Sequence, residues 1–400
     1  MRRAIEAGDP FGLRSLDVET LRRRPGTKWH RPDGRLAAWV ADMDFPIAPA
    51  IRDRLVERAR TDVGYPDWSH AAVSPLRDRF VERMTTRYGW RPDRDRLVEL
   101  NDVVQGVRIA IHHLTEPGDG VVLHTPAYPP FFRAIEQLGR RVVRAPWPFD
   151  ADGLEDVVAA QRPRVLLLCH PHNPIGHVFS RDELVAIAAT AERHDLQVVS
   201  DEIHADLTFS PSVHVPFESL GPDAAARTVT LTSASKAFNL AGLRWAVLHA
   251  GSDRMHAALR RLPAHYFGAP NVMAVEATDA AWSEGDDWAS AVMAVLDENR
   301  HLLATLLAEH LPEVGYRVPD ATYLAWLDCR DLGFGDDPAV EFARRGVELS
   351  PGPTFGVEGH GHVRLNFATS PMVLTEIVTT MARPVPPAGP PTGPPTAIST

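Results

Sequence analysis

The stretch RTVTLTSASKAFNLAGLR, residues 227–244, decides the fold of this chain. An apolar run typical of a buried strand comes first, and Ser233 and Lys236 follow it directly. The chain has 42 basic residues, yet only Lys28 and Lys236 are lysines. Arginine can replace lysine where positive charge is enough, but it cannot supply an amine that loses its proton. Lys236 is therefore a candidate for amine chemistry, whereas Lys28, in the polar segment RRRPGTKWH, is interpreted as chance survival.

Strands and helices are predicted in alternation on both sides of this stretch. Continuous apolar runs predict strands at 121–125, 141–146, 165–170, 197–203 and 227–235. Amphipathic patterns predict helices at 49–62, 71–87, 131–139, 181–194 and 287–311. Uninterrupted apolar strands between helices indicate an α/β fold with a mainly parallel sheet covered on both faces. Ligands of such sheets bind beyond the carboxyl ends of the strands, where the segments HPHNP, DEIH and SASK all fall.

The sequence divides into an N-terminal segment, a large domain, a small α+β domain and a tail. We place these parts at 1–45, 46–286, 287–382 and 383–400, with the N-terminal segment belonging to the small domain. The large domain carries the expected parallel sheet. The tail, RPVPPAGPPTGPPTAIST, is rich in proline and glycine, which predicts disorder.

Composition excludes several kinds of protein. A formal net charge of −10 argues against a nucleic acid or an anionic membrane as partner. No segment approaches the length of about 20 apolar residues that crosses a bilayer, and the first residues lack the apolar run of a signal peptide. Cys169 and Cys329 make no disulfide framework, so we expect a cytoplasmic, reduced protein.

The surroundings of Lys236 separate several kinds of chemistry. A P-loop is excluded because Thr27 and Ser235, not glycine, precede the lysines. Ser233 and Lys236 fit the S-x-x-K pattern of serine acyl-enzymes, but the K-T-G motif of those enzymes is absent. Pyridoxal phosphate (PLP) needs a lysine amine, an acid facing its pyridine nitrogen, phosphate donors and a flat partner for its ring. Asp201, at the end of the expected strand QVVSDEI, is a suitable acid, with a helix cap or turn as the alternative.

Motifs of other cofactors are missing. Histidine pairs such as His170 and His172 have no matching cysteine or carboxylate spacing, and H-E-x-x-H is absent, so no catalytic metal is expected. The absence of G-x-G-x-x-G and G-x-S-x-G argues against a dinucleotide-binding protein and an α/β-hydrolase.

Several segments, taken in order, resemble one family of PLP enzymes. They are HNPIG (172–176), SDEIH (200–204), SASKAFNLAGLR (233–244) and VRLNFATS (363–370). This set resembles the fold-type I enzymes of aminotransferase class I/II, which have the aspartate-aminotransferase fold. WVADMDF (39–45), read with DEIHADL and AGLR, is similar to the MalY/PatB-type cystathionine β-lyases. The resemblance extends from about Leu21 to Ala382.

The resemblance implies roles around the cofactor ring. Lys236 would hold PLP as a Schiff base and, once freed by the substrate, transfer the proton. Asp201 would pair with the pyridine nitrogen, and Tyr128 would stack on the ring. Asn173 would donate to the phenolic oxygen, although an Asn-Pro turn is also typical of this position. His204 stands where many relatives have a tyrosine that contacts the same oxygen.

The resemblance also implies how the phosphate is held. Ser233 and Arg244 would bind it together with backbone amides near Gly106 and Val107. The family loop usually reads like G-V-V-P-A, whereas residues 102–106 read D-V-V-Q-G here. The chain departs from the family pattern at this loop.

Further residues are implied on the substrate side. Arg364 would clamp the α-carboxylate of an amino acid, and Asp42 lies in the segment that forms one wall of the substrate pocket in the family. Tyr65, in VGYPDW, resembles the tyrosine that reaches the phosphate of a partner subunit. The resemblance therefore implies a homodimer with shared active sites.

The motifs do not decide between two reactions. β-Elimination from an S-substituted cysteine would release a thiol, pyruvate and ammonia, whereas reprotonation at the cofactor would give transamination. WVADMDF and DEIHADL favour the β-lyase, with cystathionine or a bulkier conjugate as substrate and an aminotransferase as the alternative. A regulatory protein is a further class, but no separate regulatory domain is present in the sequence.

Overall fold

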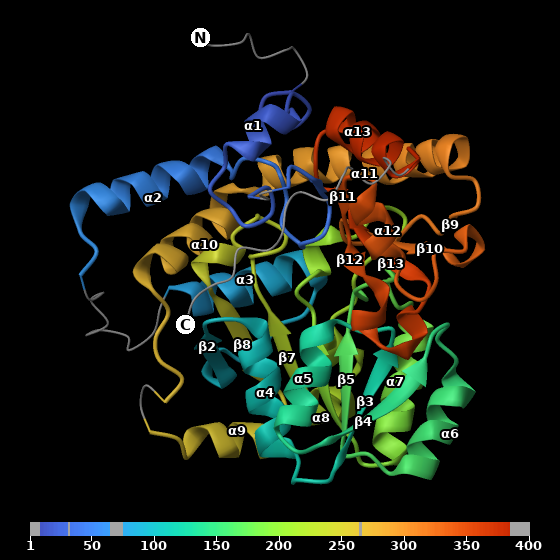
Figure 1. Cartoon of the computed structure of the whole chain (residues 1–400). Coiled ribbons are helices and arrows are strands. Elements are labelled where there is room, and N and C mark those ends of the chain that lie inside the picture. The colour runs from blue at the N-terminus through green and yellow to red at the C-terminus, as the bar shows by residue number, and fades with distance from the viewer. Residues whose placement is uncertain (1–8, 31–32, 65–74, 264–265, 385–400) are drawn as a thin grey trace, which may run out of the picture.

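A computed structural model describes residues 9–30, 33–64, 75–263 and 266–384 (Figure 1). Tyr65, the start of the helix expected at 71–87 and the tail from residue 385 onward lie outside the described residues. Figure 1 shows a large sheet between helices and, above it, a smaller sheet with helices of its own. No helix in the described part of the chain is long and apolar enough to cross a membrane.

The large sheet has the strand order β2-β8-β7-β6-β5-β3-β4. Its strands are Leu97–Leu100 (β2), Gly120–Thr125 (β3), Arg141–Pro146 (β4), Val165–Cys169 (β5), Gln197–Asp201 (β6), Thr228–Thr232 (β7) and Ala246–Ala250 (β8). β8 runs antiparallel to both of its neighbours, and the remaining neighbours are parallel. The prediction of a mainly parallel sheet is confirmed.

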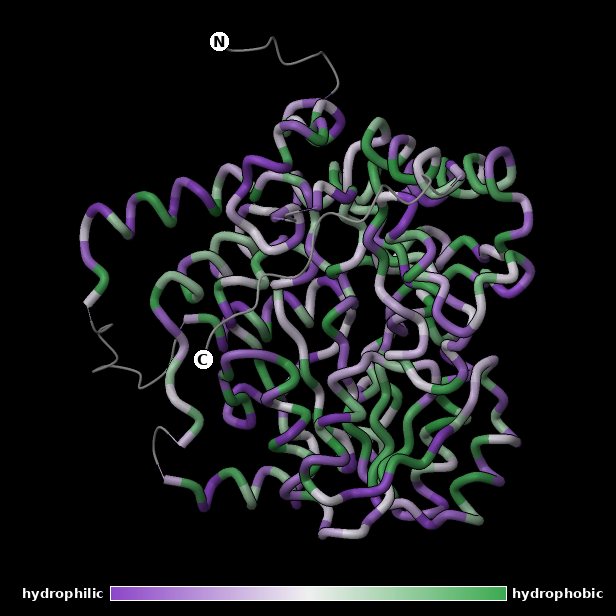
Figure 2. The backbone as a smooth tube through the Cα atoms, viewed as in Figure 1, coloured by the Kyte–Doolittle hydropathy of each residue, from purple (hydrophilic) through white to green (hydrophobic). Residues whose placement is uncertain are grey.

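Helices bury both faces of this sheet. One face is covered by α4 (Val103–Leu114), α5 (Pro129–Gln137) and α9 (Asp253–Arg260), and the other by α6 (Ala151–Gln161), α7 (Arg181–Arg193) and α8 (Pro222–Arg227). Successive residues of β5 alternate between the two apolar clusters, with Leu166 in one and Leu167 in the other. Burial on both faces explains why the strands read as uninterrupted apolar runs. Figure 2 shows these strands as a hydrophobic centre.

The smaller sheet is antiparallel, with the order β12-β13-β10-β9. Its strands are Gly315–Tyr316 (β9), Leu324–Asp328 (β10), Ser350–Pro351 (β12) and His362–Asn366 (β13). The helices of this part of the chain are Asp286–His310 (α11), Pro338–Arg344 (α12) and Pro371–Met381 (α13). The long helix expected at 287–311 is thus α11. The domain boundaries given above stay a prediction.

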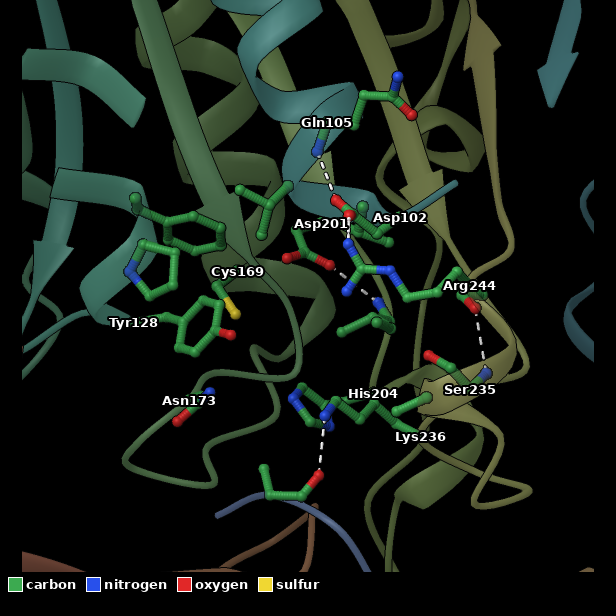
Figure 3. Close-up of a pocket in the computed structure, with 18 of the residues that line it drawn as sticks. Asp102, Gln105, Tyr128, Cys169, Asn173, Asp201, His204, Ser235, Lys236 and Arg244 are labelled. Atoms are coloured by element: carbon green, nitrogen blue, oxygen red, sulfur yellow. Dashed lines mark hydrogen bonds and ion pairs between the residues drawn. The ribbon is translucent and has the colours of Figure 1, made fainter. Parts of the chain in front are cut away.

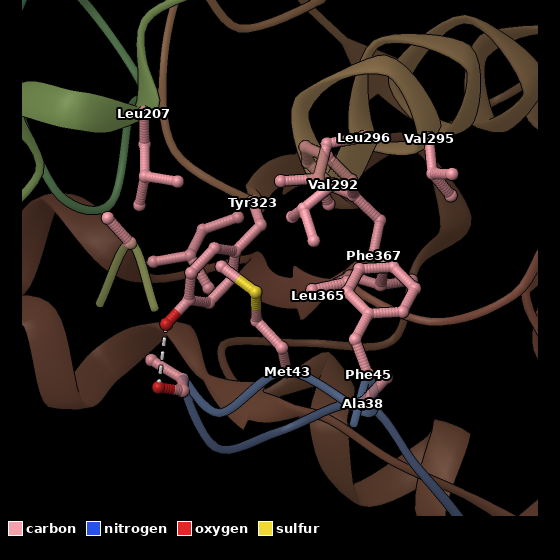
Figure 4. Packing of buried hydrophobic residues seen from close by; sticks show 14 of the residues in the cluster. Ala38, Met43, Phe45, Leu207, Val292, Val295, Leu296, Tyr323, Leu365 and Phe367 are labelled. Atoms are coloured by element: carbon pink, nitrogen blue, oxygen red, sulfur yellow. Dashed lines mark hydrogen bonds between the residues drawn. The ribbon is translucent and has the colours of Figure 1, made fainter. Parts of the chain in front are cut away.

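The N-terminal segment packs against this smaller sheet. β1 (Leu36–Ala37) pairs in parallel with β11 (Val347–Glu348), and Met43 and Phe45 pack beside Phe367 (Figure 4). The remaining helices are α1 (Val18–Arg22), α2 (Pro49–Thr61), α3 (Leu76–Tyr88) and α10 (Val272–Glu284). This packing carries residues 39–45 to the carboxyl ends of the central strands, where the site lies.

Candidate active site

Lys236 lies in the turn that follows β7, at the carboxyl edge of the large sheet. Its Nζ donates a hydrogen bond to the carbonyl oxygen of Ala41 at 2.8 Å. Loss of hydration lowers the pKa of the Lys236 amine, with the charge of Asp42 acting against this shift. A lowered pKa enlarges the fraction of neutral amine, which is the nucleophilic form.

The segment 39–45 is fixed beside Lys236 by two asparagine side chains. Asn239 accepts from the backbone nitrogen of Met43 at 3.1 Å and donates to the carbonyl oxygens of Met43 and Phe45, each at 3.0 Å. Asn366 donates to the carbonyl oxygens of Val40 and Asp42, each at 2.7 Å. Sequence reasoning missed both asparagines, because a side chain that holds a distant backbone leaves no periodic pattern.

Lys28 also supports this segment, which corrects its interpretation as chance survival. Its Nζ lies 3.0 Å from Oδ1 of Asp44, and both side chains are buried. The same Nζ donates to the carbonyl oxygen of Asp42 at 3.0 Å, and Trp29 Nε1 donates to Asp44 Oδ1 at 2.6 Å. Lys28 is therefore a structural lysine outside the cavity, with a charge that the buried Asp44 requires.

Asp201 ends β6 and faces the cavity (Figure 3). It pairs across the sheet with Cys169, the last residue of β5, which lines the same cavity. Its Oδ1 accepts from the backbone nitrogen of Ile203 at 3.1 Å. Burial raises the pKa of Asp201 to about 7, because the anion has lost its hydration. A cationic partner such as a protonated ring nitrogen would favour the ionised form.

Arg364, on β13, reaches across to the end of β5. Its Nη1 donates to Oδ1 of Asn173 at 3.1 Å, and its Nη2 donates to the carbonyl oxygen of Trp39 and to Ser350 Oγ, each at 3.1 Å. The guanidinium lies over the ring of Phe355, 4.9 Å from its centre. Arg364 Nε is buried and has no hydrogen-bond partner among the described residues.

Tyr128 and His204 approach the cavity from different strands. Tyr128 precedes α5, and burial raises the pKa of its hydroxyl group. His204 follows β6, and burial lowers its pKa to about 3, with the positive charges of Lys236 and Arg364 acting in the same direction. The imidazole is therefore neutral near pH 7, so that one of its nitrogens can donate a hydrogen bond and the other can accept one.

Ser233 and Arg244 lie at the end of the cavity away from Asn173 (Figure 3 labels Arg244). Ser233 donates its hydroxyl hydrogen to the carbonyl oxygen of Trp245 at 2.5 Å and accepts from the backbone nitrogen of Ser235 at 3.0 Å. It is not hydrogen-bonded to Lys236. Ser233 gives its hydroxyl hydrogen to Trp245 and Lys236 donates to Ala41, which argues against the serine acyl-enzyme alternative.

Gly106 and Val107, whose backbone amides are expected near the phosphate, lie within α4. Gly106 packs on the sheet, where an added Cβ would lie 2.3 Å from Cδ2 of Leu231, and Val107 is fully buried in the core. Neither lines the cavity. Val104 and Gln105, in the first turn of α4, do line it, and the roles of Gly106 and Val107 stay a prediction.

The predicted site residues surround two adjoining cavities of about 490 and about 570 Å³. Both cavities are lined by Lys236, Tyr128 and Arg244. The first also has Asp201, Asn173, His204 and Ser233 in its wall, and the second has Asp42 and Arg364. An amine, a buried acid, a side-chain amide and two arginines thus line these adjoining cavities, and this set fits PLP. Within the described ranges, no cluster of His, Cys, Asp and Glu is arranged to hold a metal ion.

Comparison with known proteins places these residues in a family. A relative from Mycobacterium tuberculosis (strain H37Rv) is 38% identical over 409 residues, covering 94% of this chain and 98% of the relative. Cystathionine beta-lyase PatB of Bacillus subtilis (strain 168) is 34% identical over 349 residues, covering 84% and 88%. The crystal structure of a PLP-bound C-S lyase from Staphylococcus hominis, in the external aldimine form with L-cycloserine, superposes with a TM-score of 0.83 at 28% identity, covering 90% and 96%.

A family model agrees with these similarities. The model described as aminotransferase class I and II matches residues 41–381, from the segment beside Lys236 to the end of α13. This range includes Lys236, Asp201 and Arg364. The chain therefore belongs to the aminotransferase class I and II family.

Proposed function

We propose that this chain is a PLP-dependent carbon–sulfur β-lyase that cleaves an S-substituted cysteine to a thiol, pyruvate and ammonia. The observation that carries the proposal is the meeting of Lys236, Asp201 and Arg364 around adjoining cavities. The choice of a lyase is supported by relatives named cystathionine beta-lyase and C-S lyase. An aminotransferase is the less supported alternative.

Bound PLP would supply an electron-accepting ring that stabilises negative charge at the substrate Cα. Asp201 would hold the ring nitrogen in its protonated form, because its own carboxylate is stabilised by that charge. Oδ1 of Asn173 already accepts a hydrogen bond from Arg364, which leaves its NH₂ group to donate to the phenolic oxygen. Tyr128 would stack on the ring.

The phosphate would lie between Ser233, Arg244 and the first turn of α4. Val104 and Gln105, which line the cavity there, replace Gly106 and Val107 in this proposal. The first backbone nitrogens of a helix attract anions because they have no partner within the helix.

The substrate would enter the second cavity with its α-carboxylate on Arg364. This role is supported by the position of Arg364 in the wall of that cavity and by the charge of its guanidinium. Lys236 is placed to take the Cα proton, because its lowered pKa favours the neutral amine that can accept it. The wall formed by Asp42 would face the S-substituent.

The experiment that tests this function is an assay for pyruvate with no keto acid added. Purified protein carrying PLP would be incubated with cystathionine and other S-substituted cysteines. Pyruvate with stoichiometric thiol is the expected result. An absence of pyruvate, with loss of the yellow colour that a keto acid restores, would make the protein an aminotransferase instead.

A homodimer with shared sites and a cytoplasmic location are further parts of the proposal. The dimer is supported by the resemblance of the segment around Tyr65 to the family segment that reaches a partner subunit. A reducing compartment is supported by Cys169 and Cys329, which are both buried and free. The dimer would be tested by mixing two inactive variants, Tyr65→Ala and Lys236→Ala. Recovered activity is expected, since one site of the mixed dimer is intact, and failure to recover would contradict shared sites.

A further inference from the structure

We propose that Asp102 competes with the cofactor phosphate for Arg244 and for the start of α4, and thereby weakens PLP binding. The inference rests on the proposed placement of the phosphate between Arg244 and the first turn of α4. It concerns cofactor affinity and is independent of whether the enzyme is a lyase or an aminotransferase.

The Asp102 carboxylate already uses both kinds of donor that an anion would find here. Its Oδ1 accepts from the backbone nitrogen of Gln105 at 2.7 Å and caps α4. Its Oδ2 forms an ion pair with Nη2 of Arg244, and Figure 3 shows both contacts at one end of the cavity. A carboxylate in this position is stabilised by the helix dipole for the same reason as a phosphate.

Two other polar side chains at this end already have hydrogen-bond partners. Ser233 gives its hydroxyl hydrogen to the carbonyl oxygen of Trp245. Arg108, one turn further along α4, lines the cavity but donates to Oε1 of Gln137 at 2.8 Å. Arg108 keeps its positive charge, but Arg244 and the start of α4 are the donors at this end that Asp102 already contacts.

A phosphate ester brings about two further negative charges to this place. If Arg244 stays with Asp102, the phosphate shares one guanidinium with a carboxylate of the same sign. If Arg244 turns to the phosphate, the ion pair with Asp102 is broken. Either arrangement is less favourable than binding beside a neutral cap, because like charges a few ångströms apart repel.

Substitution of Asp102 by asparagine separates its role as a helix cap from its negative charge. Asn is as good a helix cap as Asp, so Asp102→Asn preserves the start of α4 while removing the negative charge. Asp102→Ser does the same with a shorter side chain. Asp150→Asn is the matched control, since Asp150 caps α6 in the same way, through the backbone nitrogens of Asp152 and Gly153, and does not line either cavity.

The experiment measures the Kd of PLP for cofactor-free wild-type protein and for each variant, by absorbance and by quenching of tryptophan fluorescence. Asp102→Asn and Asp102→Ser are expected to lower the Kd about two- to five-fold, the range for removal of one partly exposed charge contact. Asp150→Asn should leave the Kd unchanged. Pyridoxal, which lacks the phosphate, should bind wild type and the Asp102 variants equally.

Several results would overturn the proposal. An unchanged or higher Kd for PLP in both Asp102 variants would show that the carboxylate is neutral or helps to orient Arg244. An equal gain with pyridoxal would show that the effect does not involve the phosphate. A wild-type chain that binds no PLP would refute the cofactor site, whereas a loaded protein that forms no pyruvate would refute only the lyase activity.

Discussion

Arg364 donates to Oδ1 of Asn173 at 3.1 Å and so joins the smaller sheet to the carboxyl end of the larger one. Asn173 follows β5, and Arg364 is 191 residues away on β13. The contact fixes which way the Asn173 amide points, because its oxygen faces the guanidinium. One hydrogen bond therefore orients both the proposed carboxylate clamp and the proposed donor to the cofactor ring.

Replacing Lys236 by alanine should abolish covalent attachment of PLP. Lys28 is the only other lysine of the chain and is buried in an ion pair outside the cavity. After reduction with borohydride, mass spectrometry of the wild-type protein should find the label on the peptide that contains Lys236. A label on Lys28, or a reducible yellow cofactor in Lys236→Ala, would contradict the proposed site.

Replacing Arg364 by glutamine should weaken binding of the substrate more than binding of the cofactor. Loss of a charge-assisted hydrogen bond to a carboxylate removes about 2 kcal/mol, so kcat/KM should fall about 30-fold, mainly through KM. Asn173→Ala is the matched variant, since it should shift the absorbance of bound PLP with a smaller change in KM. Equal losses of PLP and substrate affinity in Arg364→Gln would refute the carboxylate role.

The central sheet was predictable because burial on both faces leaves a simple signal in the sequence. β5 reads as an unbroken apolar run, and in β6 Asp201 follows the apolar pair Val198 and Val199. The antiparallel direction of β8 was not predictable in this way. It depends on the loop 233–245 returning without a helix, and apolar composition is the same for a strand of either direction.

The parts of the site that were missed depend on contacts between distant segments. Gly106 looked like a loop glycine, but it is a helix residue whose missing side chain makes room for Leu231. Lys28 stands in a polar segment that gives it no chemical context, but the fold buries it beside Asp44. Neither role follows from local pattern, because both partners are brought together only by tertiary packing.

Replacing Lys28 by methionine should destabilise the protein without removing its amine chemistry. The methionine fills a similar volume but leaves Asp44 buried without its cationic partner, which costs about 3 kcal/mol in the free energy of unfolding. Denaturant unfolding would measure the loss. The double variant Lys28→Met, Asp44→Asn should recover much of it, and a single variant as stable as the wild type would show that the ion pair contributes little.

Stability should fall as the pH is lowered from about 6.5 towards 4, because several buried histidines resist protonation. Burial lowers the pKa of His124 to about 4 and that of His172 to about 3. Below the ordinary imidazole pKa of about 6.5, the unfolded chain binds protons that the folded chain excludes. The unfolded state then gains stability with each step down in pH until the folded pKa is reached.

His124→Phe should flatten this dependence, since His124 packs beside Phe149 and Phe179 and neither of its ring nitrogens has a partner among the described residues. A shift of the His124 pKa from 6.5 to about 4 corresponds to roughly 3 kcal/mol. This is the expected contribution of His124 to the loss in free energy of unfolding between pH 6.5 and pH 4. Asp201 acts in the opposite direction, because its pKa is raised, but it is common to both proteins. Denaturant midpoints across this pH range would measure the difference, with the exposed His301→Gln as control. Parallel pH profiles for wild type and His124→Phe would show that His124 is protonated in the folded state.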